Sequence, residues 1–150
     1  MVTEAEKLIQ KKFPKDLAAF RQIQQVIKLL DVSKIDVDEN INGDKISSHI
    51  IVEAMSMIYG LELEHGYFQN HYKHSWIRTH NSFIIDVRPI GIIDPIMVDN
   101  DIFSKYGENY IVDPNLVYRD FSGEDHERVV NLVAAAINSI IEILKDESRD

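Results

Sequence analysis

The chain contains no cysteine. This absence excludes a disulfide framework, a zinc site with thiolate ligands and an iron–sulfur cluster, because each of them needs cysteine sulfur. It also excludes a cysteine nucleophile in the chain as it stands. Covalent chemistry would have to begin at another side chain.

Positive charge is also scarce. The 150 residues include 16 Lys and Arg but 25 Asp and Glu, which gives a formal net charge of −9. Phosphate backbones and anionic lipid surfaces attract proteins through a positive face. The composition therefore argues against a nucleic acid or an anionic membrane surface as the partner.

Long apolar runs and linker-type segments are missing as well. No segment reaches the roughly 18 to 20 continuous apolar residues of a membrane span, and the charged start MVTEAEKLIQKKF lacks the apolar core of a classical signal peptide. We therefore expect a soluble chain, while export by a route that needs no such signal stays open. The four prolines are scattered and no Gly/Ser-rich linker occurs, so residues 1–150 are predicted to form one domain.

The N-terminal part has the apolar spacing of two helices. Residues 3–12 predict a short helix that ends before Pro14, because the residue before a proline is disfavoured in helical conformation. Residues 15–30 place apolar side chains at three- and four-residue steps, which predicts one amphipathic helix. Residues 31–44 are polar and irregular, with a turn expected at Asn42-Gly43-Asp44.

Two further helices are expected. Residues 46–59 are apolar on nearly every face, which is typical of a helix buried in the centre of a domain, and Gly60 is a natural end for it. The last helix is expected to begin near Ser122 and to bury a stripe that starts at Val129. For the central helix we predict almost complete burial of Ile50, Ile51, Ala54, Met55 and Ile58.

Strand-like stretches follow the central helix. They cover residues 61–69, 74–79 and 82–87, and the last is apolar enough for a strand buried on both faces. Residues 88–121 predict mostly loop, with a short strand near 110–112. The predicted fold class is therefore α+β, with helices at both ends and a central helix followed by an antiparallel sheet.

Four histidines fall close together in the sequence: His65, His71, His74 and His80. They would suit a metal site, but no H-E-x-x-H or comparable ligand spacing is present and no cysteine ligand exists. We therefore predict surface and strand histidines with ordinary partners, and no metal site.

His74 and Asp86 lie on neighbouring predicted strands. A carboxylate that holds an imidazole in one tautomer forms two-thirds of a nucleophilic triad. The two side chains can meet only if the connection between their strands has an odd number of residues, because side chains alternate across a strand. A three-residue loop, Thr79 to Asn81, or a five-residue loop would place them directly opposite each other, with Asn81 suited to a left-handed position.

A motif series between residues 43 and 91 resembles the transglutaminase-like (papain-like) cysteine enzymes. The residues that carry it are Ser48-His49-Ile50-Ile51-Val52-Glu53-Ala54, Tyr59-Gly60, Gly66-Tyr67-Phe68, His74-Ser75-Trp76 and Ile84-Ile85-Asp86. Members of that superfamily begin the central helix with a catalytic Cys, and then have a Gly-aromatic strand, His-x-Trp and a strand that ends in Asp. The resemblance covers a third of the chain and implies the papain-like or transglutaminase-like fold.

Ser48 stands where the family has its cysteine. An alternative alignment places Lys45 there, but Ser48 keeps His49 and the Glu53-Ala54 pair in register. Two explanations remain: an active-site Cys→Ser variant, which we favour, or a naturally Ser-containing relative. A helix N-terminus favours a thiolate, whereas a serine hydroxyl gains far less.

The resemblance implies acyl transfer at an amide bond by a Cys-His-Asp triad, as in a protease, deamidase or transglutaminase, without a cofactor. Ser48 would mark the nucleophile, His74 the base and Asp86 the orienting carboxylate, while Trp76 and His49 would line the substrate cleft. The expected partner is a protein or peptide substrate and, for an effector or toxin, an inhibitor or immunity protein. The alternative is a non-catalytic binding module that keeps the fold, and a structure with Ser48 far from His74 would argue against catalysis.

Overall fold

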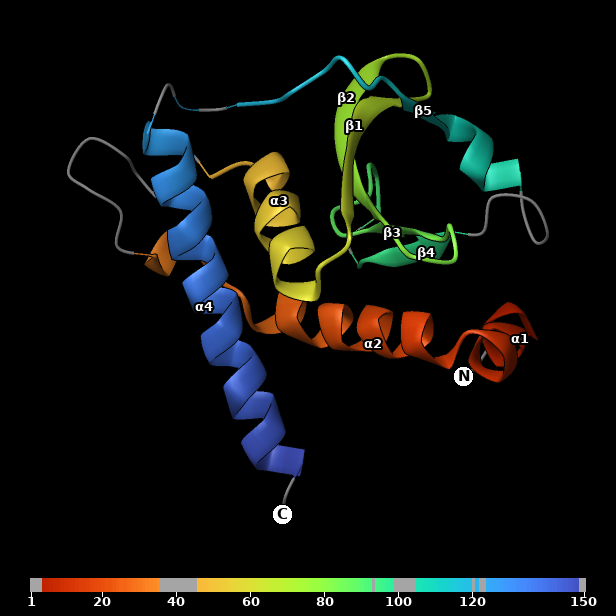
Figure 1. Cartoon of the computed structure of the whole chain (residues 1–150), viewed down its shortest axis with the longest axis horizontal. Coiled ribbons are helices and arrows are strands. Elements are labelled where there is room, and N and C mark those ends of the chain that lie inside the picture. Colours follow the sequence, from red (N-terminus) through yellow and green to blue (C-terminus); the bar gives the residue numbers. More distant parts are fainter. Residues whose placement is uncertain are drawn as a thin grey trace.

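A curled antiparallel sheet and a set of helices make up the molecule. The computed structural model describes residues 4–35, 46–92, 94–98, 105–119, 121 and 124–148. In Figure 1, helix α3 lies between the sheet and the long C-terminal helix α4, and α2 runs along one end of both α3 and the sheet. The helices are α1 (Glu4–Lys12), α2 (Pro14–Leu29), η1 (Val32–Lys34), α3 (Ser48–Tyr59), η3 (Lys105–Asn109) and α4 (Glu124–Ser148).

Within the described residues the sheet has five strands in the order β4-β3-β2-β1-β5, and each pair of neighbouring strands is antiparallel. The strands are β1 (Glu62–Phe68), β2 (Tyr72–Arg78), β3 (Ile84–Asp86), β4 (Ile96–Val98) and β5 (Tyr110–Val112). The predicted α+β class is confirmed, since helices and an antiparallel sheet occupy separate parts of the chain.

Most predicted elements are present with small changes at their ends. Pro14 begins α2 instead of only preceding it, because a proline lacks the N–H that the first helical residue leaves unpaired anyway. Gly60 ends α3 in the left-handed conformation, with φ of 63°. Strand β4 lies where only loop was expected: it has just three residues and an edge position, so it leaves little periodic signal.

Two of the sequence predictions fall outside the described residues, namely the turn at Asn42-Gly43-Asp44 and the helix start at Ser122. Across the described ranges, none of the helices combines the length and the apolar character needed to cross a membrane.

One face of the sheet packs against α3. Ile50, Ile51, Ala54 and Met55 of this helix are at most 3% exposed, as predicted, but Ile58 is only half-buried and that part of the prediction is wrong. From the sheet, the same core contains Ile77, Phe83, Ile85 and Val87, and it is completed by side chains of α2 and α4. Helix α3 is therefore the centre of the larger core.

The opposite face of the sheet carries a second, smaller core. Its buried members are Phe68, Trp76, Ile84, Val98 and Tyr110, which come from all five strands. Side chains alternate across each strand, so Trp76 and Ile84 point away from α3 while their neighbours Ile77 and Ile85 point toward it. Each face of the sheet thus carries buried apolar side chains that belong to one of the two cores.

Candidate functional site

The His74 and Asp86 side chains meet, as the sequence predicts. His74 Nε2 lies 2.9 Å from one carboxylate oxygen of Asp86 and 2.8 Å from the other. His74 is 3% exposed and Asp86 is fully buried. Because Nε2 faces the carboxylate, Nδ1 is the ring nitrogen that remains for a second partner, and it makes no hydrogen bond within the described residues.

The strand register differs by two residues from the prediction. Ile77 pairs with Ile85, and this register continued by one residue sets Asp86 opposite Trp76, diagonal to His74. The connection has the predicted odd number, since the Thr79 N–H donates to the Phe83 carbonyl at 2.9 Å and leaves three residues at the tip. Because the connection has an odd number of residues, His74 and Asp86 lie on the same face of the sheet. Diagonal neighbours on one face lie within reach of long side chains.

The left-handed residue of this connection is Ser82, with φ of 69°, and not Asn81 as predicted. The loop begins one residue later than expected, which moves the position that needs positive φ by one residue as well.

Asp86 is held from a second side. The Tyr110 hydroxyl donates a hydrogen bond of 2.6 Å to the Asp86 carboxylate. Burial, followed by the negative charge of Asp86, raises the pKa of Tyr110, so its hydroxyl stays a neutral donor. Trp76 is fully buried beside them and donates from Nε1 to Glu64 at 2.7 Å, so it lines no open cleft.

Ser48 lies at the start of α3, on the other side of the sheet. Ser47 caps the helix, with its hydroxyl accepting from the His49 N–H at 3.2 Å, and Ser48 is the first helical residue and half-buried. The next residue, His49, contacts Ser75, which neighbours His74 in β2 and therefore points to the opposite face. The sheet thus lies between Ser48 and the His74–Asp86 pair, and the structure does not assemble the predicted triad.

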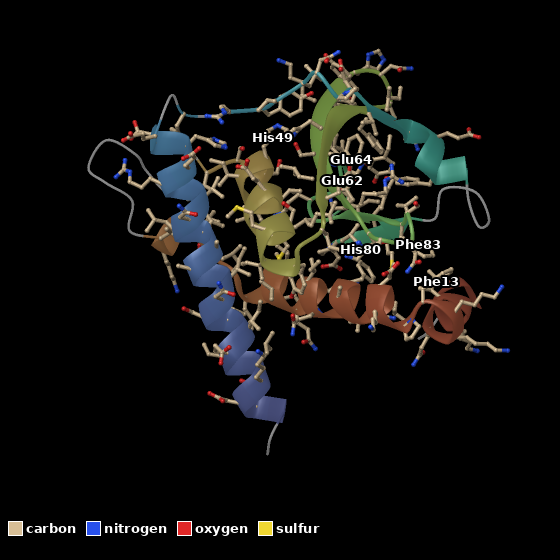
Figure 2. All side chains as sticks on the ribbon, in the orientation of Figure 1. Phe13, His49, Glu62, Glu64, His80 and Phe83 are labelled. Atoms are coloured by element: carbon tan, nitrogen blue, oxygen red, sulfur yellow. The ribbon has the colours of Figure 1, made fainter. Side chains whose placement is uncertain are left out.

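Instead, three polar side chains meet where α3 touches the sheet. The Ser75 hydroxyl lies 2.7 Å from Nδ1 of His49 and 2.7 Å from Nδ1 of His65, its cross-strand partner. One hydroxyl hydrogen serves only one imidazole, so the other ring must itself donate from Nδ1. Figure 2 shows His49 at the N-terminal end of α3, beside the sheet. This cluster fastens the N-terminus of α3 to β1 and β2.

Further groups surround the cluster. The Tyr118 ring lies 4.5 Å from His49 and 5.2 Å from His65 between centroids, and its hydroxyl donates to the Gly66 carbonyl at 2.7 Å. One helical turn along α3 from His49, Glu53 accepts from His126 of α4 at 2.7 Å. The pKa of His65 is lowered, chiefly by burial, with Glu53 opposing and His126 adding to the effect. The neutral form of His65 is therefore favoured in the folded protein.

The lowered pKa of His65 predicts a loss of stability in mild acid. Protonation favours the state with the higher pKa, which is the unfolded chain, so stability falls as pH drops below the unfolded value of 6.5 and keeps falling down to the folded value. We expect urea unfolding curves between pH 7 and pH 5 to show this slope and His65→Gln to flatten it. An equally steep slope in His65→Gln would assign the dependence to another group.

The four neighbouring histidines do not gather around one point. His65 and His74 point to opposite faces of the sheet, while His71 precedes β2 and His80 follows it, at opposite ends of the strand. Over the part of the chain that the structure describes, no group of three His, Asp or Glu side chains is arranged to hold a metal ion.

A groove begins between α3 and α4 and continues along the surface of α4. A pocket of about 330 Å³ is lined by Glu53, Met57, Glu127, Val130 and Asn131. A second pocket of about 490 Å³ shares two of these residues and continues along α4; it is lined by Glu124, Glu127, Arg128, Asn131 and Leu132. Met57 is 56% exposed at this groove. We call these two pockets together the α3/α4 groove.

Sequence reasoning missed the Ser75 cluster and the α3/α4 groove. Ser75 stands between His74 and Trp76, which drew attention as motif residues, and a small polar residue in a strand carries no signal of its own. One side of the groove could have been found from the sequence, because Glu53 and Met57 lie four residues apart and therefore share one face of the central helix. The partner surface on α4 begins about seventy residues later, so no local pattern joins the two.

Comparisons of the chain with protein-family models, with curated proteins and with solved structures found no match.

Proposed function

We propose that this chain is a non-catalytic protein-binding domain that keeps a transglutaminase-like order of central helix and antiparallel strands. One observation carries the proposal: the sheet lies between Ser48 and the His74–Asp86 pair. A base can activate a nucleophile only within hydrogen-bond reach. Ser48 therefore has no base beside it, and the His74–Asp86 pair has no nucleophile.

The surroundings of the histidine support a structural role. The His74–Asp86–Tyr110 set is buried between aromatic rings, with Phe68 and Trp76 at centroid distances of 6.1 and 6.0 Å from His74. A buried carboxylate that accepts from two side chains, as Asp86 does from His74 and Tyr110, stabilises a unique packing of such a core. The α3/α4 groove, by contrast, offers exposed side chains at a concave surface, which is what recognition of a partner needs.

Acyl transfer at an amide bond stays as a second candidate function, and one observation favours it. His74 has a carboxylate on Nε2 and no hydrogen bond on Nδ1 within the described residues, which is the arrangement of an oriented general base. This candidate requires α3 or the sheet to rearrange so that the position of Ser48 reaches the imidazole.

The variant Ser48→Cys tests the two functions against each other. A thiol paired with His74 would form a thiolate and react rapidly with iodoacetamide at slightly acidic pH. With the sheet between them, we expect the alkylation rate of Ser48→Cys to be the same in the presence and absence of His74→Gln. The measurement is the rate of mass gain on the intact protein.

Two controls accompany this test. Circular dichroism must show that His74→Gln is folded, and Asp86→Asn provides a second substitution in the same pair. A rate that drops severalfold in both folded double variants would show that the imidazole reaches residue 48, and the binding-domain proposal would be wrong.

A further inference from the structure

The α3/α4 groove combines negative charge with apolar surface. Glu53, Glu124 and Glu127 line it, and Arg128 is the one cation among its lining residues. Glu53 already accepts from His126 at 2.7 Å, which leaves Glu124 and Glu127 to face a ligand. Arg128 Nη2 already lies 3.1 Å from the Asp125 carboxylate, so its charge is partly compensated. The groove therefore presents a net negative potential in a chain whose formal charge is −9.

The apolar part of the groove comes from both helices. Met57 of α3 is 56% exposed and Leu132 of α4 is half-buried, whereas Val130 lines the first pocket but is only 3% exposed. Methionine is flexible and polarizable, so an exposed one adapts to an incoming apolar side chain. Glu124, Glu127 and Asn131 follow each other at helical spacing along α4 and place carboxylates beside this apolar surface.

From these observations we infer that the α3/α4 groove binds a basic peptide segment of a partner protein, with an apolar side chain seated against Met57 and Lys or Arg side chains facing Glu124 and Glu127. The inference rests on the proposed function, because it names the partner class of that binding domain. Charge complementarity selects this occupant: an acidic segment would meet the carboxylates of Glu124 and Glu127, and a purely apolar one would leave both of them without partners.

The test uses short fluorescent helical peptides and the whole chain. One peptide contains Lys, Leu and Ala; two matched peptides carry Gln or Glu in place of Lys, and binding is measured by anisotropy. We expect the Lys peptide to bind and to be released by salt, and the Glu peptide not to bind. Glu127→Lys should weaken binding of the Lys peptide by about tenfold, because it reverses the charge of a side chain that lines both pockets.

Glu142→Lys is the matched control. It makes the same charge change on an exposed side chain of the same helix, outside the residues that line the groove. We expect it to weaken binding by less than about threefold. A second control is Met57→Ala. It should weaken binding of the Lys peptide without changing how that binding depends on salt concentration.

Several results would overturn the inference. Equal weakening by Glu127→Lys and Glu142→Lys would show attraction by net charge alone, and equal binding of the Gln peptide would show an apolar groove without charge selection. Self-association in sedimentation that Glu127→Lys abolishes would assign the groove to a second copy of this chain. In these cases the binding domain stands and only its partner class changes, whereas fast, His74-dependent alkylation of Ser48→Cys contradicts the proposed function itself.

Discussion

Gly66→Ala is expected to lower the free energy of unfolding by at least about 3 kcal/mol, because the new Cβ has no space. Gly66 lies in β1 between two strands, and a Cβ there would lie 1.9 Å from the Ile111 carbonyl oxygen and 2.9 Å from Cη2 of Trp76. The first contact is with backbone, so a rotamer change cannot relieve it. Strand β5 would have to leave β1, and the Tyr118 hydrogen bond to the Gly66 carbonyl would be lost with it.

Urea unfolding of the variant measures this loss. Gly91→Ala is the matched control, since Gly91 has φ of +79° but nothing lies within 4 Å of its added Cβ. It should cost about 1 kcal/mol for the left-handed backbone alone. Similar losses in the two variants would mean that β5 does not approach Gly66 as closely as the structure shows.

Asp86→Ala is expected to cost about 3 to 5 kcal/mol of stability, because it leaves two buried groups without their hydrogen-bond partner, at about 1 to 3 kcal/mol for each. Both His74 Nε2 and the Tyr110 hydroxyl bond to the Asp86 carboxylate, and neither meets solvent that could replace it. The second core, which holds all five strands together on the face away from α3, would weaken with it. Chemical unfolding followed by Trp76 fluorescence reports on this core directly.

Two comparison variants accompany Asp86→Ala. Tyr110→Phe removes one donor and leaves the histidine pair intact, so it should cost about 1 kcal/mol. Asp94→Ala changes an exposed carboxylate and should stay within about 0.5 kcal/mol. If Asp86→Ala resembled Asp94→Ala in stability, the pair would not be structural, and a catalytic role for His74 would become the better explanation.

Local pattern was enough for the helices and for the fold class. The three- and four-residue apolar steps of residues 15–30 and the uniformly apolar residues 46–59 correspond to α2 and α3, since helix periodicity is a property of neighbouring residues. Parity was also local: an odd connection sufficed to place His74 and Asp86 on one face of the sheet. The strand register could not be predicted from the local pattern. A shift of two residues leaves each side chain on the same face of the sheet but changes which residues of β2 and β3 lie opposite each other.

What the sequence by itself determined was therefore the α-helices, every strand except β4, the α+β class and the two sets of side chains on the sheet. Only the tertiary structure decided which set faces α3. Both sets are apolar, with Phe68, Trp76 and Ile84 on one face and Ile77 and Ile85 on the other, so either face could have covered the helix. Because the second set packs against α3, Ser75 and not His74 meets the start of that helix, and the residues that resemble a triad lie on opposite sides of the sheet.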